Sequence, residues 1–172
     1  MKQSIQDDPM LGASPGLVRL DRRELIYHAS LRMADQARRE LLLFGPTLDP
    51  DLYDQRPFLN AVRQLALARP VLSVRILIFD ARQASLSGHR LIELARRLTS
   101  RIAIRCVDED DQDRLDAFLI ADECGYIRRQ MANSLEAVAD FNNPGEARRL
   151  RAAFNPIWER GASPLELRRL DL

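Results

Sequence analysis

The chain has 172 residues, of which 46% are hydrophobic and 30% charged, and its formal net charge is +1. This length predicts one domain with a core of ordinary size, and the near-zero charge excludes a bulk electrostatic pull toward nucleic acid or an anionic membrane. No apolar run approaches the roughly 20 residues that span a bilayer. Asp7 and Asp8 stand where a signal peptide needs its apolar core, so we expect a cytoplasmic protein.

The residue usage also limits the chemistry. Lys2 is the only lysine, which excludes a P-loop lysine, a Schiff-base lysine and a lysine phosphate clamp inside the domain. Codon bias is the simplest explanation of the high arginine content. Cys106 and Cys124 lack metal-ligand spacing, and we expect both to be reduced core residues, although the sequence leaves a disulfide between them open.

The first two-thirds of the chain alternates between strand and helix patterns. Residues 1–16 lack periodicity and predict a flexible tail, followed by one domain over 17–172. His28 lies beside the apolar stripe of the first helix and is expected to be an ordinary helix residue. The predicted elements are an edge strand at 17–20, a helix from Asp21 as N-cap to about 39, a strand at 40–44, a helix from Pro57 to 69, a strand at 73–79, a helix at 89–98 and a strand at 101–107.

The last third of the chain is organised around a β-hairpin at 115–128. Residues 117–121 form an unbroken apolar run, as in a strand buried on both faces, and Gly125 is expected to supply a positive φ for the turn. The acidic run at 108–113 lacks the glycine and the spacing of a calcium loop, and we interpret it as a solvated loop.

The C-terminal elements complete the fold prediction. A strand is expected at 137–141, and residues 142–144 should cap a long helix that Pro156 kinks. The whole order predicts an α/β sandwich with a mixed sheet, parallel in its first part and antiparallel at the hairpin.

Three segments carry a resemblance to a known family. They are ELLLF at 40–44, SVRILIF at 73–79 and, above all, LDAFLIADECGYI at 115–127. Together with the C-terminal helix that bears Phe154 and Trp158, they resemble one half-domain of the phospholipase D superfamily over about residues 21–160. In that family the third segment reads His-x-Lys, four residues, then Asp. Asp122 matches the aspartate, whereas Leu115 and Ala117 replace the histidine and the lysine.

The resemblance implies chemistry that these replacements remove. In the family a histidine attacks phosphorus and lysines neutralise the phosphoryl oxygens, but leucine cannot attack and alanine carries no charge. Neither His28 nor His89 has a lysine two residues later, so we expect no phosphodiester transfer by the family route, even in a homodimer. The chain also resembles uncharacterised bacterial proteins with this degenerate half-domain, some of them joined to a GNAT-type acetyltransferase domain. It lacks the acetyl-CoA loop of the Arg/Gln-x-x-Gly-x-Gly/Ala type.

Candidate ligand-binding residues come from the rule that ligands of α/β sheets bind outside the carboxyl ends of the strands. The functional interpretation is a phosphate-sized pocket in which the planar fork of arginine replaces lysine and His89 adds a donor at a helix start. The structural interpretation is that the aspartates are caps and turn residues and the arginines are solvated. The candidates are Asp80, His89, Arg90, Asp122, Arg128, Asp140 and Asn142; no catalytic residue, metal or cofactor is predicted.

Three functions remain open on the sequence. The first, which we favour, is a non-catalytic binding or scaffold module that acts as a homodimer, because half-domains normally pair, with a protein partner such as an acetyltransferase. The second is an arginine-based phosphate or nucleic-acid binder, which the net charge does not support. The third is an enzyme, either with a rebuilt site around His89 and Asp80 or an acetyltransferase by association.

Overall fold

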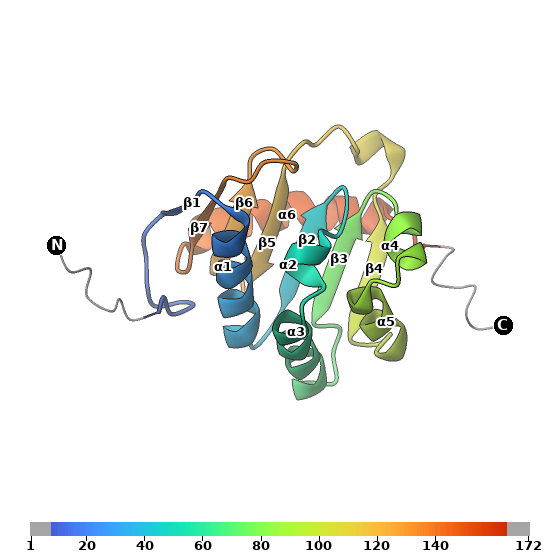
Figure 1. The fold of residues 1–172 in the computed structure, drawn as a ribbon, viewed down its shortest axis with the longest axis horizontal. Helices are drawn as coiled ribbons and strands as arrows, with labels where there is room; N and C mark the ends of the chain where they lie inside the picture. The colour runs from blue at the N-terminus through green and yellow to red at the C-terminus, as the bar shows by residue number, and fades with distance from the viewer. Residues whose placement is uncertain (1–7, 165–172) are drawn as a thin grey trace.

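Seven strands make up one mixed sheet in the computed structural model, which describes residues 8–164 (Figure 1). The strands are β1 Val18–Leu20, β2 Leu41–Gly45, β3 Val74–Ile78, β4 Ile102–Cys106, β5 Ala117–Ala121, β6 Gly125–Arg129 and β7 Ala137–Asp140. Their order across the sheet is β1-β7-β6-β5-β2-β3-β4. β2, β3 and β4 are parallel, and every other pairing is antiparallel. The predicted mixed α/β fold is confirmed.

Helices cover both faces of the sheet. Figure 1 shows α1 to α5 in front of the strands and α6 crossing behind them. Two short helices, α2 and α4, stand where the sequence predicted loops; Asp49 caps α2 by accepting a hydrogen bond from the Asp51 N–H at 3.0 Å. The helices are α1 Arg23–Gln36, α2 Pro50–Tyr53, α3 Arg56–Ala68, α4 Arg82–Leu86, α5 Arg90–Arg97, the 3-10 turn η1 Glu109–Asp111 and α6 Pro144–Arg160.

The core consists of two layers, because strand side chains alternate between the faces. Leu41 and Leu43 of β2 pack toward α1, α3 and α5, whereas Leu42 and Phe44 pack toward α6. β2 and β5 are buried at every position, as the unbroken apolar run of residues 117–121 predicts. These two strands form the rigid centre from which both edges of the sheet are positioned.

Three local predictions are corrected by the structure. The N-cap of α1 is Arg22 rather than Asp21. Within the predicted flexible tail, residues 1–7 lie outside the described part, but the segment after them is held: the Gly12 N–H donates to the Phe141 carbonyl at 2.7 Å, and the Leu11 N–H donates to Gln36 at 2.8 Å. The hairpin turn takes its positive φ at Asp122 (53°) and Glu123 (57°), not at Gly125.

The strand directions define two edges of the sheet. β2, β3 and β4 end at what we call the upper edge, which is uppermost in Figure 1. Because β5 and β7 run the opposite way, they end at the lower edge, with the 122–124 turn. Cys106 at the end of β4 and Cys124 in that turn therefore lie at opposite edges, which excludes a disulfide between them.

Two further properties of the described residues concern membrane-spanning helices and metal-binding clusters. Between residues 8 and 164, no helix has the length and apolarity needed to cross a membrane. In the same range, no three His, Cys, Asp or Glu side chains gather closely enough to hold a metal ion. The acidic run at 108–113 folds around η1, and Asp111 pairs with Arg160 at 2.7 Å.

Candidate functional site

The positions of the family's histidine and lysine lie at the upper edge, at the start of β5. Leu115 precedes the strand and is 64% exposed, while its carbonyl accepts a hydrogen bond from the Ala132 N–H at 2.8 Å. Ala117 is 3% exposed and pairs with Arg129 in the β5–β6 ladder. One position is therefore exposed and the other buried, and neither Leu115 nor Ala117 supplies a nucleophile or a cation.

A buried carboxylate lies between these two positions. Asp116 is 3% exposed, and each of its oxygens accepts a hydrogen bond from Arg114, at 2.7 and 3.0 Å; Arg128 adds a further bond at 2.9 Å. The Arg114 guanidinium also lies over the rings of Phe44 and Phe118, 5.9 and 5.3 Å from their centroids. Arg128, a sequence candidate for phosphate binding, is thus engaged with a carboxylate of the protein itself.

His89 is the N-cap of α5 and is 3% exposed. Its Nδ1 accepts a hydrogen bond from the Leu91 N–H at 3.2 Å, and its Nε2 is buried beside the Leu48 backbone without a well-aligned bond. Burial lowers the pKa of His89 below its ordinary value, against the opposing effect of the nearby Asp54 carboxylate. Burial therefore favours the neutral imidazole, whose Nδ1 is the acceptor.

The other two upper candidates are also tied locally. Arg90 donates to the Asp54 carboxylate at 2.7 Å and to the Asp54 carbonyl at 3.0 Å. Asp80 is exposed and accepts from the Arg82 N–H at 2.9 Å, which, with the Arg82 side chain, lowers its pKa. No hydrogen bond or ion pair among residues 8–164 joins Asp80 to His89, so the structure does not join the two residues as the rebuilt site of the enzyme hypothesis needs.

Three candidates lie at the opposite, lower edge. Asp122 accepts hydrogen bonds from the backbone N–H groups of Arg38, Arg39 and Glu40, at 2.8, 2.8 and 3.0 Å. Asp140 accepts from the N–H of Asn142 at 3.0 Å, so these two residues form a local turn. The rule of carboxyl ends grouped all the candidates at one edge, which is wrong because β5 and β7 run against the parallel strands.

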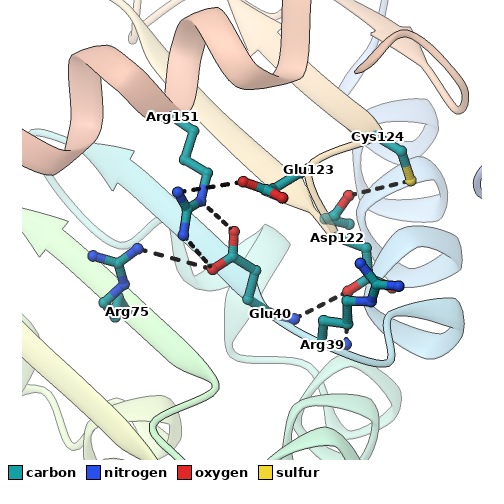
Figure 2. A network of polar contacts seen from close by, with 8 residues as sticks. Arg39, Glu40, Arg75, Asp122, Glu123, Cys124 and Arg151 are labelled. Atoms are coloured by element: carbon teal, nitrogen blue, oxygen red, sulfur yellow. Dashed lines mark hydrogen bonds and ion pairs between the residues drawn. The ribbon is translucent and has the colours of Figure 1, made fainter. Parts of the chain in front are cut away.

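A charged network covers the lower edge beneath α6 (Figure 2). Arg151 of α6 donates two hydrogen bonds to Glu40, at 2.6 and 3.2 Å, and pairs with Glu123 at 3.3 Å. Arg75 of β3 lies 3.9 Å from Glu40. The bond to Glu40 raises the pKa of Arg151, whereas burial lowers the pKa of Arg75.

Two adjoining hollows flank this network. The larger, of about 380 Å³, is named the arginine hollow here and is lined by Arg38, Arg39, Asp122, Glu123, Cys124, Pro144 and Arg148. The second, of about 260 Å³, is lined by Arg39, Glu40, Arg69, Val71, Leu72, Asp122, Glu123 and Arg151. Sequence reasoning missed Arg38, Arg39 and Arg148. The arginine doublets at 38–39 and 148–149 were visible, but a rule about carboxyl ends does not point to an edge where parallel strands begin.

Comparison with known proteins gives a family. A family described as a domain of unknown function, DUF7931, matches residues 22–170. The chain belongs to the DUF7931 family. No curated protein matches it.

Several solved structures are similar in fold to this DUF7931 chain. TrmBL2, described as an archaeal chromatin protein with a novel mode of DNA binding, has a TM-score of 0.59 and 17% identity over 86% of this chain, which spans 54% of that one. Nuc from Salmonella typhimurium, a phospholipase D family member, has a TM-score of 0.58 and 17% identity, with coverage of 87% and 97%. Phosphatidylserine synthase from Haemophilus influenzae Rd KW20 has a TM-score of 0.60 and 11% identity, with coverage of 87% and 38%.

The neighbours bear out the phospholipase D-like fold, and at these identities they bear on the fold alone. The predicted loss of the His-x-Lys half of the motif is a statement about Leu115 and Ala117 in this chain.

Proposed function

We propose that this DUF7931 chain is a non-catalytic phospholipase D-like binding module that acts as a homodimer. The observation that carries the proposal is the pair Leu115 and Ala117, one exposed and the other sealed in the β5–β6 ladder. Phosphodiester transfer needs a nucleophile and cations around the phosphoryl oxygens. At the positions where the family has its nucleophile and its cation, this chain has the apolar side chain of Leu115 and the methyl group of Ala117.

The remaining polar groups of the upper edge support the non-catalytic part of the proposal. Arg114 and Arg128 are paired with Asp116, and Arg90 is paired with Asp54. His89 caps a helix through Nδ1 and is buried. Groups engaged in this way stabilise the fold, and each would have to break an existing interaction before it could act on a substrate.

Exposed apolar side chains at the upper edge support the homodimer. Leu115, Met131 and Leu135 are 64%, 47% and 52% exposed, and the hydrogen bond from Ala132 to Leu115 brings the first two segments together. An isologous interface buries the same apolar surface on both copies. The phospholipase D resemblance implies pairing of half-domains, so a second copy is the expected occupant.

Catalysis is tested with bis(p-nitrophenyl) phosphate and with plasmid DNA as substrates. We expect the purified chain to hydrolyse neither above the level of a His89→Asn variant, in which asparagine preserves the helix cap. Hydrolysis by the wild-type chain that disappears in His89→Asn would overturn the non-catalytic role.

Pairing is tested by light scattering during size exclusion. We expect the wild-type chain to elute at twice the mass of one chain, and the Leu115→Glu, Met131→Glu double variant to elute as a monomer. Leu67→Glu is the matched control, because Leu67 is a similarly exposed apolar residue on α3. A wild-type monomer, or a dimer insensitive to the double variant but lost in the control, rejects this interface.

A nucleic-acid role is the second candidate, favoured by the fold neighbour described as binding DNA. It predicts affinity that falls steeply with salt. The net charge of +1 and the paired arginines of the upper edge weigh against it. An acetyltransferase partner, expected from the resemblance, stays a prediction that co-purification with such a domain would test.

A further inference from the structure

The arginine hollow contains cations that the protein does not neutralise. Among residues 8–164, the side chains of Arg38, Arg39 and Arg148 form no hydrogen bond or ion pair, and all three are exposed. The arginines of the pocket predicted from sequence behave oppositely, since Arg90 and Arg128 are both paired with aspartates. Three guanidinium groups without a partner among the described residues therefore line one hollow at the lower edge, on the side away from Leu115 and Ala117.

The two carboxylates of the same hollow are already occupied. Asp122 receives three backbone N–H groups, from residues 38, 39 and 40, and Glu123 pairs with Arg151. The hydrogen bonds to Asp122 also fix the backbone of Arg38 and Arg39. The side chains of both arginines therefore extend from an anchored segment. Their side chains keep all their donors for an external anion, because guanidinium groups bind carboxylate and phosphate through the same planar fork.

The N-terminus of α6 adds to the positive field. Pro144 lines the hollow, and α6 is 17 residues long, so the positive end of its dipole lies at this surface. The Asn143 side chain caps only the Glu146 N–H, at 3.1 Å. Burial and the Asp122 charge raise the pKa of the Cys124 thiol, which disfavours the thiolate at neutral pH.

On the footing that the chain works by binding, we propose that the arginine hollow is a site for the phosphate group of a small phosphorylated ligand. The volume of about 380 Å³ is within the usual range for small-molecule sites. No aromatic side chain lines either hollow, whereas single-stranded nucleic acid is normally held by stacking on aromatic rings. The adjoining hollow, with Val71 and Leu72 exposed at 41% and 43%, has room for the rest of the ligand.

The test is calorimetric titration of the full chain with inorganic pyrophosphate at low salt. Arg39→Ala and Arg148→Ala should each weaken binding about tenfold, the loss expected for a charged hydrogen bond, and the double variant should abolish it. Arg149→Ala is the matched control: Arg149 is the next residue on α6, is exposed, and pairs with Glu146 outside the hollow. Unchanged circular dichroism shows that the variants fold.

Three results would overturn the site. They are no heat of binding for the wild-type chain, equal weakening by Arg149→Ala, and tighter binding of a twelve-nucleotide single strand that the same variants lose, which would assign the hollow to nucleic acid. The readout is separate from the phosphodiesterase assay. Hydrolysis would reject the non-catalytic role and leave pyrophosphate binding intact, whereas absent binding would reject the hollow and leave the non-catalytic role intact.

Discussion

Ala117 of β5 and Arg129 of β6 are direct partners in the antiparallel ladder, so their side chains emerge on the same face of the sheet. The Arg129 guanidinium donates to the Ala132 carbonyl at 2.7 Å. On the neighbouring strand, a Cβ built on Gly45 would lie 3.3 Å from the Ala117 Cβ. Ala117 is thus a buried methyl group, 3% exposed, that lies close to Gly45 and has an arginine as its cross-strand neighbour.

Restoring the family's lysine should therefore destabilise the protein. We expect Ala117→Lys to lower the free energy of unfolding by about 2 kcal/mol, through overpacking and through repulsion by Arg129, as measured by urea denaturation. Leu115→His, at an exposed position, should change it by less than about 0.5 kcal/mol. A lysine variant as stable as the wild type would show that position 117 still accommodates the lysine side chain of the family.

The Asp122 carboxylate anchors the backbone from Arg38 to Glu40 through three hydrogen bonds. Asp122→Ala should lower the free energy of unfolding by about 2 kcal/mol, since hydrogen bonds to a charged group are lost. Asp122→Asn keeps an acceptor oxygen and tolerates the positive φ of 53°, so it should lose about half as much. Hydrogen exchange at residues 38–40 should be faster in the alanine variant, and equal losses in the two variants would contradict the anchoring role.

Most elements were predictable because their signals are local. The β-branched run at 73–79 and the apolar run at 117–121 specify buried strands, and the proline and asparagine at 143–144 specify a helix start. The short helices α2 and α4 were not predictable: four or five residues carry too little periodicity. The hairpin turn was predicted at the right place but with the wrong residue in positive φ.

The site was harder to predict than the fold, because it depends on strand direction. Placing Asp122 and Asp140 beside Asp80 requires β5 and β7 to run parallel to β3, but the antiparallel pairing between β2 and β5 moves both residues to the opposite edge. The pairing of Arg128 with Asp116 and the exposure of Arg148 are also tertiary properties. Sequence spacing does not encode which arginine will find a carboxylate.

Gly125 has a packing role in place of the conformational one expected from its position in the turn. A Cβ there would collide with Leu11 Cδ1 and lie 3.4 Å from the Asp140 carbonyl. We expect Gly125→Ala to lower the free energy of unfolding by about 1 kcal/mol and to release residues 10–14 to proteolysis. Adding Leu11→Ala should recover part of that loss by removing the clash. A double variant whose losses simply add would show that the two residues do not interact.

His89 makes the stability of the protein depend on pH. Burial lowers the pKa of His89 in the folded state, while Asp54 and Asp49 favour the charged form and Arg90 opposes it. Protonation of Nδ1 would also remove the acceptor of the Leu91 N–H. The unfolded chain therefore binds the proton more readily, and the free energy of unfolding increases with pH between the folded and the unfolded pKa of His89.

The contribution of His89 should be complete above the unfolded pKa of about 6.5 and should decline as the pH falls from there toward the lower folded pKa. The slope should not exceed about 1.4 kcal/mol per pH unit for one proton. Urea denaturation of the wild type and of His89→Asn between pH 5 and pH 8 measures it, since asparagine caps the helix without titrating, and His28 is common to both chains. Because Asp80 has its pKa lowered by Arg82, its protonation lies below this window. If the free energy of unfolding had the same slope against pH in both chains, His89 would be as easily protonated in the folded state as in the unfolded state. That result would contradict the effect of burial at the N-cap of α5.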